Sequence, residues 1–228
     1  MIENMVSTIV YCSKHIKETS LIDPQIVKSR VIYNFIKIEH FLSKKSLHEN
    51  MYKLLFVGRI DENKGLLELL KTMRNLPLTY TLSIVGAPKS SNSQYYIDCL
   101  NNIVALRIAG YQVNFLNEKT QQEMPRIYKS HDLVCCLSQQ QEAYGMVAVE
   151  AILSGCAVIG SKLGGLEEAI PDQKFLITEY WNSEKIAQEI KRIVEMQDLD
   201  IRISDCSAIL QERHLFYMNF SQYQTLIQ

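Results

Sequence analysis

Two carboxylates, Glu142 and Glu150, lie at the ends of the segment EAYGMVAVE. Its apolar pattern predicts a helix from Gly145 or Met146, so that Glu142 precedes the helix and Glu150 lies about one turn inside it. The first N–H groups of a helix have no intrahelical partner and attract anions. The segment therefore predicts a linear binding site, in which backbone amides that bind an anion lie between two carboxylates. Each carboxylate can accept hydrogen bonds from hydroxyls of a ligand. A nucleotide diphosphate sugar presents its sugar hydroxyls, diphosphate and ribose hydroxyls in that order.

A second cluster, GRIDENKG at residues 58–65, carries two cations, Arg59 and Lys64. It follows the apolar run KLLFVG, which predicts a buried strand, and it opens an amphipathic helix. Gly58 lets another group approach the backbone closely, and the two cations can converge on an anion such as a diphosphate. The spacing matches neither the Walker P-loop nor GxGxxG, so it indicates neither an ATPase nor a dehydrogenase.

A third cluster runs from Gly155 to Glu168, where an apolar strand enters a Gly-Gly turn and an acidic helix start. Gly164 and Gly165 permit close backbone approach beside the carboxylate segment. Each cluster alone is compatible with ordinary structure: a solvated turn, a loop carboxylate, an exposed helix residue or plain turn glycines. Together, in this order and each beside a predicted strand, they are far more specific.

The elements that must position these clusters alternate strictly along the chain. Strands are expected at 53–58, 79–86, 112–116, 132–137, 157–160 and 175–178, and helices at 64–76, 94–109, 121–129, 146–154 and 183–197. This alternation predicts an α/β fold, a Rossmann-like parallel sheet with helices on both faces. Ligands of such sheets bind at the carboxyl ends of the strands, where the three clusters fall.

The first 45 residues fit this pattern poorly. Residues 6–11 resemble a strand, 15–21 a short helix and 31–41 a connector. We expect the strand to be the last one of another domain; the alternative is that it extends the edge of the main sheet.

Composition narrows the function classes. The 228 residues are 47% hydrophobic and have a net charge of -1, which excludes a polycation that binds nucleic acid non-specifically. The six cysteines form no CxxC pair, which favours a reduced intracellular protein. We expect a cytoplasmic chain, because no signal peptide or membrane-spanning run is seen, with at most peripheral contact at the inner face of a membrane. No Asp cluster suggests a metal-bridged diphosphate.

These motifs resemble those of the donor-binding C-terminal half of a glycosyltransferase family 4 enzyme, which has the GT-B architecture of two Rossmann-like domains. The resemblance covers roughly residues 30 to 225 and rests on four segments, FVGRIDENKG, EAYGMVAVE, GCAVIG and Gly164-Gly165. It divides the chain into residues 1–45, the remnant of an N-terminal domain and hinge; 46–215, the donor-binding domain; and 216–228, a helical tail.

The resemblance also implies roles for single residues. Arg59 and Lys64 would hold the diphosphate and offset charge on the leaving group, Glu142 would face the transferred sugar, and Glu150 would bind the ribose. The base would lie near residues 115–117 and the ends of the preceding strands. Sugar and phosphate would contact the backbone around four further residues: Tyr144, Gly145, Met146 and Val147.

Three positions depart from the family pattern. Residues 34–37 read Asn-Phe-Ile-Lys where Asn-Gly-Ile-Asp is usual, Asn117 stands where Gly is common, and Ala157 where Pro is common. These departures concern the hinge and base recognition, not the sugar and phosphate positions.

The sequence thus predicts a hexosyltransferase-type enzyme with retention of configuration, acting on a glycan or lipid-linked acceptor in cell-surface polysaccharide synthesis. It would need no metal or cofactor besides the nucleotide sugar. The alternative is a non-catalytic nucleotide-sugar-binding subunit, or a truncated remnant, that needs a separate acceptor-domain chain. An epimerase of the same architecture is disfavoured because no convincing His or carboxylate pair supplies acid–base catalysis, and His131 is expected to be structural.

Overall fold

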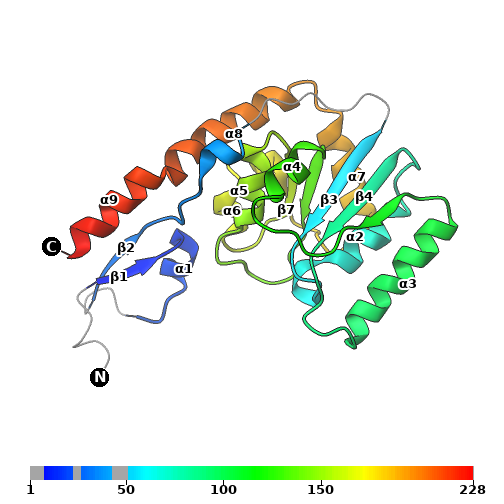
Figure 1. Ribbon diagram of the computed structural model, residues 1–228, viewed down its shortest axis with the longest axis horizontal. Helices are drawn as coiled ribbons and strands as arrows, with labels where there is room; N and C mark the ends of the chain where they lie inside the picture. The colour runs from blue at the N-terminus through cyan, green and yellow to red at the C-terminus, as the bar shows by residue number, and fades with distance from the viewer. Residues whose placement is uncertain (1–7, 23–26, 43–50, 228) are drawn as a thin grey trace.

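The computed structural model of the protein describes residues 8–22, 27–42 and 51–227. Its main feature is a parallel six-stranded sheet in the order β5-β4-β3-β6-β7-β8 (Figure 1). The strands are β3 (Tyr52–Val57), β4 (Tyr80–Val85), β5 (Val113–Phe115), β6 (Leu133–Cys136), β7 (Ala157–Ser161) and β8 (Leu176–Ile177). The predicted Rossmann-like sheet is confirmed.

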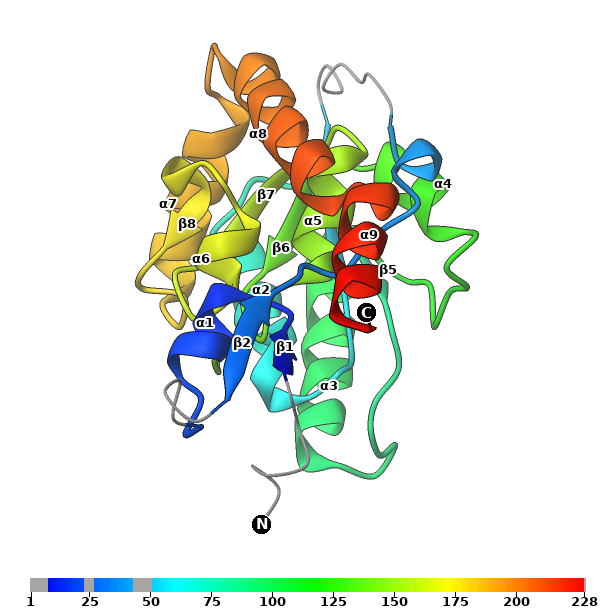
Figure 2. The ribbon, with the colours of Figure 1, turned by 90° about the vertical axis from the view of Figure 1, so that its left-hand side faces the viewer.

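Two helical layers enclose this sheet (Figures 1 and 2). Helices α2 and α7 contact each other and α2 also contacts α3, whereas α4, α6 and α8 contact α5. Their bounds are α2 (Leu66–Met73), α3 (Gln94–Ile108), α4 (Met124–Lys129), α5 (Met146–Leu153), α6 (Leu166–Ala169), α7 (Ser183–Val194) and α8 (Leu199–His214). Short 3-10 turns are η1 (Ile38–His40), η2 (Glu62–Lys64) and η3 (Gln173–Phe175).

The core explains why the apolar runs become strands. Leu54, Leu55, Leu82, Val134 and Val158 are all fully buried. A parallel strand with helices on both faces is apolar on both sides, so these strands are recognised as continuous hydrophobic runs and not as alternating patterns.

The strand order reverses beside β3, which pairs with β4 on one side and β6 on the other. Chain connections leave in opposite directions from such a point, so a crevice opens at the carboxyl ends of the two strands. The loops that follow β3 and β6 carry the Arg59–Lys64 cluster and Glu142.

The helix predicted at 64–76 begins later than expected. Gly65 has a φ of 71°, in the left-handed region, and separates η2 from α2. A Cβ at this position would lie 2.0 Å from the carbonyl oxygen of Leu137, so only glycine fits between the two loops. Lys64 is therefore placed by a 3-10 turn and not by the first turn of α2.

The N-terminal segment forms a separate small sheet. β1 (Thr8–Tyr11) pairs in parallel with β2 (Lys28–Val31), and neither strand joins the main sheet. The alternative in which the first strand extends the main sheet is therefore wrong for the described residues. Residues 6 and 7 of that predicted strand lie outside the described part. The helix α1 (Lys14–Glu18) overlaps the predicted range 15–21 and begins one residue before it. The strand β2 was not predicted, because its sequence KSRV lacks an apolar run.

The C-terminal tail is the helix α9 (Phe216–Ile227). It continues from α8 away from the main sheet toward the side of the molecule that carries β1 and β2 (Figure 1). The Nδ2 of Asn219 donates to the Tyr33 carbonyl at 3.0 Å, so the tail is tied to residues 32–37, which we call the linker, between β2 and η1.

Candidate functional site

A cavity of about 230 Å³ opens at the N-terminus of α5; we call it the α5 cavity. It lies at the carboxyl ends of β3 and β6, where the topology places a ligand site. Its walls come from β3, the loop after β6, α5 and the N-terminal segment. The residues that line it are Cys12, Asn34, Phe56, Val57, Lys64, Cys135, Cys136, Ser138, Glu142, Ala143, Tyr144, Gly145, Met146, Val147, Ala148 and Leu166.

Lys64 and Glu142 meet in this cavity. The Lys64 Nζ contacts the Glu142 Oε1, and the hydroxyl of Ser138 donates to the same oxygen at 2.5 Å. Both charged side chains are partly exposed, at 27% and 22%. A cation and a hydrogen-bonded carboxylate are thus held side by side at the mouth of the cavity, 78 positions apart in the chain.

The start of α5 supplies amides to the same cavity. Gly145 is the N-cap residue, with a φ of 109° and no side-chain capping bond, and its carbonyl accepts from Ala148 and Val149. The N–H groups of Met146 and Val147 precede the first intrahelical bond, so they are available to an anion. The helix start predicted at Gly145 or Met146 is confirmed.

The Tyr144 side chain points away from a ligand position. It is 2% exposed, and its hydroxyl contacts the Nε2 of His214 at 2.9 Å and accepts from Arg213 at 3.2 Å. Tyr144 can therefore serve the cavity only through its backbone.

A second cavity of about 520 Å³ adjoins the first at Val57; we call it the β3–β4 cavity. The residues that line it are Val57, Gly58, Arg59, Val85, Gly86, Ala87, Glu118, Lys119, Gln121, Met124 and Glu150. The four charged residues singled out in the sequence thus divide between two neighbouring cavities. Lys64 and Glu142 line one, and Arg59 and Glu150 line the other.

Glu150 faces the β3–β4 cavity from α5. The hydroxyl of Tyr128 donates to its Oε2 at 2.9 Å. Burial raises the pKa of Glu150 above its ordinary value, and the Tyr128 hydrogen bond opposes this shift. A second hydroxyl at this carboxylate would compensate part of the desolvation.

Arg59 is less constrained. Its Nε lies 3.2 Å from the Asp61 carboxylate, and its side chain is 65% exposed. Arg59 and Lys64 do not touch the same partner in this structure, because Asp61 holds one and Glu142 holds the other.

The residues expected near a base, 115–117, do not line the β3–β4 cavity, but they directly precede Glu118 in the chain, which does. Asn117 has a φ of 57°, and its carbonyl accepts from the Gly86 N–H at 3.1 Å. Asn tolerates the left-handed region better than most residues, which explains how it replaces Gly there. The Ala157 N–H donates to the Asp132 carbonyl at 3.0 Å, a bond that Pro would lack.

Gly164 and Gly165 allow two backbone segments to meet. Glu142 and Gly164 form an isolated β-bridge, and the Gly165 N–H donates to the Glu142 carbonyl at 2.7 Å. The close approach predicted for these glycines is present, and its partner in the structure is the loop that carries Glu142.

Residues that were not assigned to the site from the sequence include Cys12, Asn34 and Ser138, which line the α5 cavity, and Tyr128, which bonds Glu150. Ser138 directly follows a predicted strand, a position that could have identified it. Cys12 and Asn34 come from the N-terminal segment and Tyr128 from α4, and no local pattern relates them to the cavities.

Thiol chemistry is disfavoured at Cys136, which lines the α5 cavity. Burial, with a smaller contribution from Glu142, raises the pKa of Cys136 to about 12. The thiolate is therefore scarce at neutral pH. His131 has a structural role, since it is 7% exposed and its Nδ1 lies 2.7 Å from the Ile127 carbonyl. Within the described ranges, no group of three or more His, Cys, Asp or Glu is arranged to hold a metal ion.

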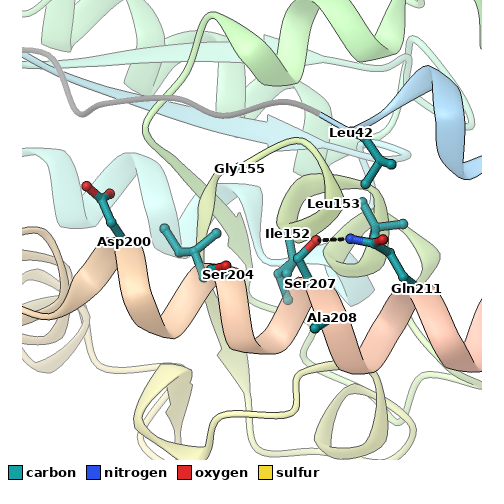
Figure 3. Close-up of a pocket in the computed structure, with 10 residues that line it drawn as sticks. Leu42, Ile152, Leu153, Gly155, Asp200, Ser204, Ser207, Ala208 and Gln211 are labelled. Carbon is teal, nitrogen blue, oxygen red and sulfur yellow. Dashed lines mark hydrogen bonds between the residues drawn. The ribbon is translucent and has the colours of Figure 1, made fainter.

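A larger groove of about 590 Å³ lies elsewhere, between α8, the end of α5 and Leu42 (Figure 3). Its polar side chains are Asp200, Ser204, Ser207 and Gln211, and the last two are bonded to each other at 3.1 Å (Figure 3). It is away from the carboxyl ends of β3 and β6 and brings no cation near a carboxylate. None of the helices in the part of the chain that the structure covers has the length and hydrophobicity needed to span a bilayer.

Comparisons with known proteins identify the family and the fold of the chain. Residues 38–207 match the family model of glycosyl transferases group 1. The chain is 33% identical over 153 residues to the lipopolysaccharide 1,2-N-acetylglucosaminetransferase of Salmonella typhimurium, covering 64% of this chain and 40% of the relative. It is 34% identical over 119 residues to the D-inositol 3-phosphate glycosyltransferase of Mycobacteroides abscessus, covering 52% and 26%.

Among solved structures, HepE of Anabaena in complex with UDP and glucose superimposes with a TM-score of 0.82 at 24% identity. That match covers 97% of this chain and 63% of HepE. WaaG, a glycosyltransferase of lipopolysaccharide biosynthesis, superimposes with a TM-score of 0.70 at 17% identity, over 94% of this chain and 60% of WaaG. The chain therefore spans less than two thirds of the length of these proteins, and it has the fold of the C-terminal half of a GT-B protein.

Proposed function

Since the chain belongs to the glycosyl transferases group 1 family, we propose that it carries the site for a nucleotide diphosphate sugar, the donor in a sugar-transfer reaction. The proposed acceptor is a glycan or a lipid-linked glycan in cell-surface polysaccharide synthesis. The lipopolysaccharide relative and the lipopolysaccharide structure support this acceptor class.

The observation that carries the proposal is the contact of Lys64 with Glu142 beside the uncapped start of α5. A diphosphate needs positive charge and N–H groups, which Lys64 and the amides of Met146 and Val147 supply. A sugar next to the diphosphate needs hydrogen-bond acceptors for its hydroxyls, which Glu142 supplies. An entering diphosphate competes with Glu142 for Lys64, and the released carboxylate can then accept hydrogen bonds from the sugar hydroxyls.

The nucleoside part of the donor would lie in the β3–β4 cavity. Glu150, one of two glutamates that line this cavity, accepts a ribose hydroxyl in this proposal. The base would then lie between Gly86 and Glu118, one residue beyond the range expected from the sequence. UDP in the similar HepE structure supports a nucleoside diphosphate as the ligand class.

Catalysis in this proposal is stabilisation of the departing diphosphate. Its charge grows as the bond to the sugar breaks, so cations and oriented amides bind it more tightly in the transition state than in the ground state. Lys64 and the α5 amides act at the β-phosphate, and Arg59 swings from Asp61 to the same diphosphate. We propose that transfer retains the anomeric configuration and needs no metal.

The division of the chain also belongs to this proposal. Residues 46–215 would bind the donor, whereas 1–45 and 216–228 would connect it to an acceptor-binding domain. β1 and β2 form a sheet of their own and α9 reaches the linker, which supports such a connection.

Calorimetric titration with UDP, UDP-glucose, GDP-mannose and ADP-glucose tests the donor site. We expect one of the nucleotide sugars to bind, and Glu142→Ala and Lys64→Met to weaken its affinity at least tenfold without unfolding the chain. Lys71→Met on α2 and Glu212→Ala on α8 are matched controls, because both residues are exposed. Wild-type affinity in both site variants would reject the assignment.

Transfer is then assayed with the nucleotide sugar that binds, in the presence and absence of EDTA, on membrane and glycan fractions. Equal rates with and without EDTA are expected for metal-independent transfer, and loss of rate with EDTA would refute it. Binding without turnover by the chain alone would favour the second possibility, a nucleotide-sugar-binding subunit that needs a separate acceptor domain. The anomeric proton coupling of the product decides between retention and inversion.

A further inference from the structure

A chain of polar contacts leads away from the donor loop, which we define as residues 142–145, into the interior. The Tyr144 hydroxyl lies 2.9 Å from the Nε2 of His214, and the His214 Nδ1 lies 2.6 Å from the carbonyl oxygen of Asn34. Tyr144 belongs to the donor loop, His214 is the last residue of α8, and Asn34 belongs to the linker. Three segments that are far apart in sequence thus meet at one imidazole.

The direction of each hydrogen bond follows from the chemistry of its atoms. A carbonyl oxygen only accepts, so the Nδ1 of His214 must carry the proton. In the neutral ring the Nε2 is then an acceptor, and the Tyr144 hydroxyl donates to it. The Tyr144 oxygen in turn accepts from the Arg213 guanidinium at 3.2 Å. All the bonds are satisfied in one direction, from Arg213 through Tyr144 and His214 to Asn34.

The surroundings keep this arrangement in place. His214 is fully buried, and burial, together with the neighbouring charge of Arg213, lowers its pKa, while the bond to Asn34 opposes that shift. Burial raises the pKa of Tyr144 to about 12, so its hydroxyl keeps its proton. The other charged group on this side is Glu168, which accepts from the Tyr33 hydroxyl and whose backbone carbonyl accepts from Arg213.

We propose that Tyr144 and His214 are positioning residues that hold the donor loop to the linker and the end of α8, so that the start of α5 points its amides at the donor phosphate. The proposal rests on the proposed function of the α5 cavity, and it adds a regulation of that cavity by the position of the linker. A movement of the linker displaces Asn34. The hydrogen bonds through His214, which we call the relay, transmit this displacement to Tyr144, next to Gly145, the N-cap residue of α5. Neither side chain touches the donor.

The loop is held from the opposite side as well, since the Gly165 N–H donates to the Glu142 carbonyl at 2.7 Å. The Ser13 hydroxyl also donates to the Ala143 carbonyl at 2.6 Å. Removal of the Tyr144 hydroxyl therefore leaves the loop in place but loosens one of its attachments. Tyr144→Phe is the sharpest variant, because the ring keeps its packing against His214 at 5.3 Å between centroids. Tyr111→Phe is its matched control: it removes a hydroxyl that donates to the Leu76 carbonyl at 3.1 Å, remote from both cavities.

The first measurement is the imidazole ¹⁵N spectrum of His214 in the whole chain between pH 5.5 and 8. We expect a neutral ring with its proton on Nδ1, and in Tyr144→Phe a shifted Nε2 resonance that Tyr111→Phe does not show. A proton on Nε2, or an Nε2 resonance that ignores Tyr144→Phe, would overturn the relay. This readout does not depend on any nucleotide.

The second measurement is UDP-glucose affinity by calorimetry, with hydrogen exchange of the Met146 and Val147 amides. Tyr144→Phe should weaken affinity by roughly three- to tenfold, as expected for one lost hydrogen bond, and speed the exchange of both amides. Tyr111→Phe should leave both unchanged. Unaltered exchange and affinity in Tyr144→Phe would overturn the proposal. If the wild-type chain binds no nucleotide, the function of the cavity is refuted, and the exchange rates still decide whether the relay holds the loop.

Discussion

Gly165→Ala should open the contact between the donor loop and the start of α6. A Cβ at Gly165 would lie 2.4 Å from the carbonyl oxygen of Ala143 and 2.5 Å from the Cα of Tyr144. Both atoms belong to the backbone, so no side chain can turn aside. The φ of Gly165 is -65°, which any residue adopts, so the substitution acts by steric overlap alone.

The size of the effect follows from these distances. Ordinary van der Waals contact begins near 3.4 Å, so the two segments must separate by about 1 Å. Overpacking of this kind costs about 1–3 kcal/mol. That loss lowers the Tm of a chain of this size by about 2–4 °C for each kcal/mol. A displacement of about 1 Å at a positioned group can also cost about 100-fold in rate, and we expect nucleotide-sugar affinity to fall about 10- to 100-fold.

Thermal unfolding and calorimetric titration with UDP-glucose measure both effects. Gly110→Ala is the control, because its φ of 93° strains the backbone while the nearest atom, on Leu78, is 3.8 Å away and the site is remote. The control should lose stability and keep affinity. If Gly165→Ala binds UDP-glucose as tightly as the wild type, the donor loop does not depend on this contact and the reasoning fails.

Three further predictions concern charge. Glu150→Gln should raise the Tm at pH 7, because burial raises the pKa of Glu150 in the folded state. The charged carboxylate therefore lowers stability as pH rises from 4.5, the ordinary pKa of Glu, through the folded pKa. The same substitution should weaken nucleoside binding, and an unchanged Tm would contradict the prediction. The free energy of unfolding should also fall as pH drops below 6.5, because burial lowers the pKa of His214 in the folded state, so the unfolded state binds the proton more readily. Urea titrations at pH 5–8 measure this dependence, and His214→Gln should remove part of it. Arg59→Ala should leave the Tm within about 1 °C of the wild type, since the side chain is 65% exposed, but weaken UDP binding; equal affinity would remove Arg59 from the site.

The order of the main elements could be read from the sequence because each buried strand is a short apolar run followed by a helix of period 3.6. β3, α2, β4, α3, β6 and α5 all lie within about three residues of their expected ranges. The small sheet of β1 and β2 was harder to predict from the sequence, because β2 has no hydrophobic run and pairs with a strand about twenty residues earlier. Such pairing is a long-range contact, and local periodicity carries no information on it.

The charged residues of the site could be named from the sequence, because Arg59, Lys64 and Glu142 lie in segments that follow predicted strands and Glu150 lies one turn inside a predicted helix. Their partners could not. Asp61 holds Arg59, Ser138 donates to Glu142, and Tyr128 donates to Glu150.

The sequence by itself therefore determined the sheet, the loops at the carboxyl ends of its strands and the types of side chain in those loops, because secondary-structure propensity and hydrophobic periodicity are local properties. Only the tertiary structure decided which charge meets which. Lys64 pairs with Glu142 across 78 positions, and His214 reaches Asn34 across 180. The first contact depends on how the loops after β3 and β6 meet where the strand order reverses, and the second on how the end of α8 packs against the linker. Tertiary packing sets both arrangements.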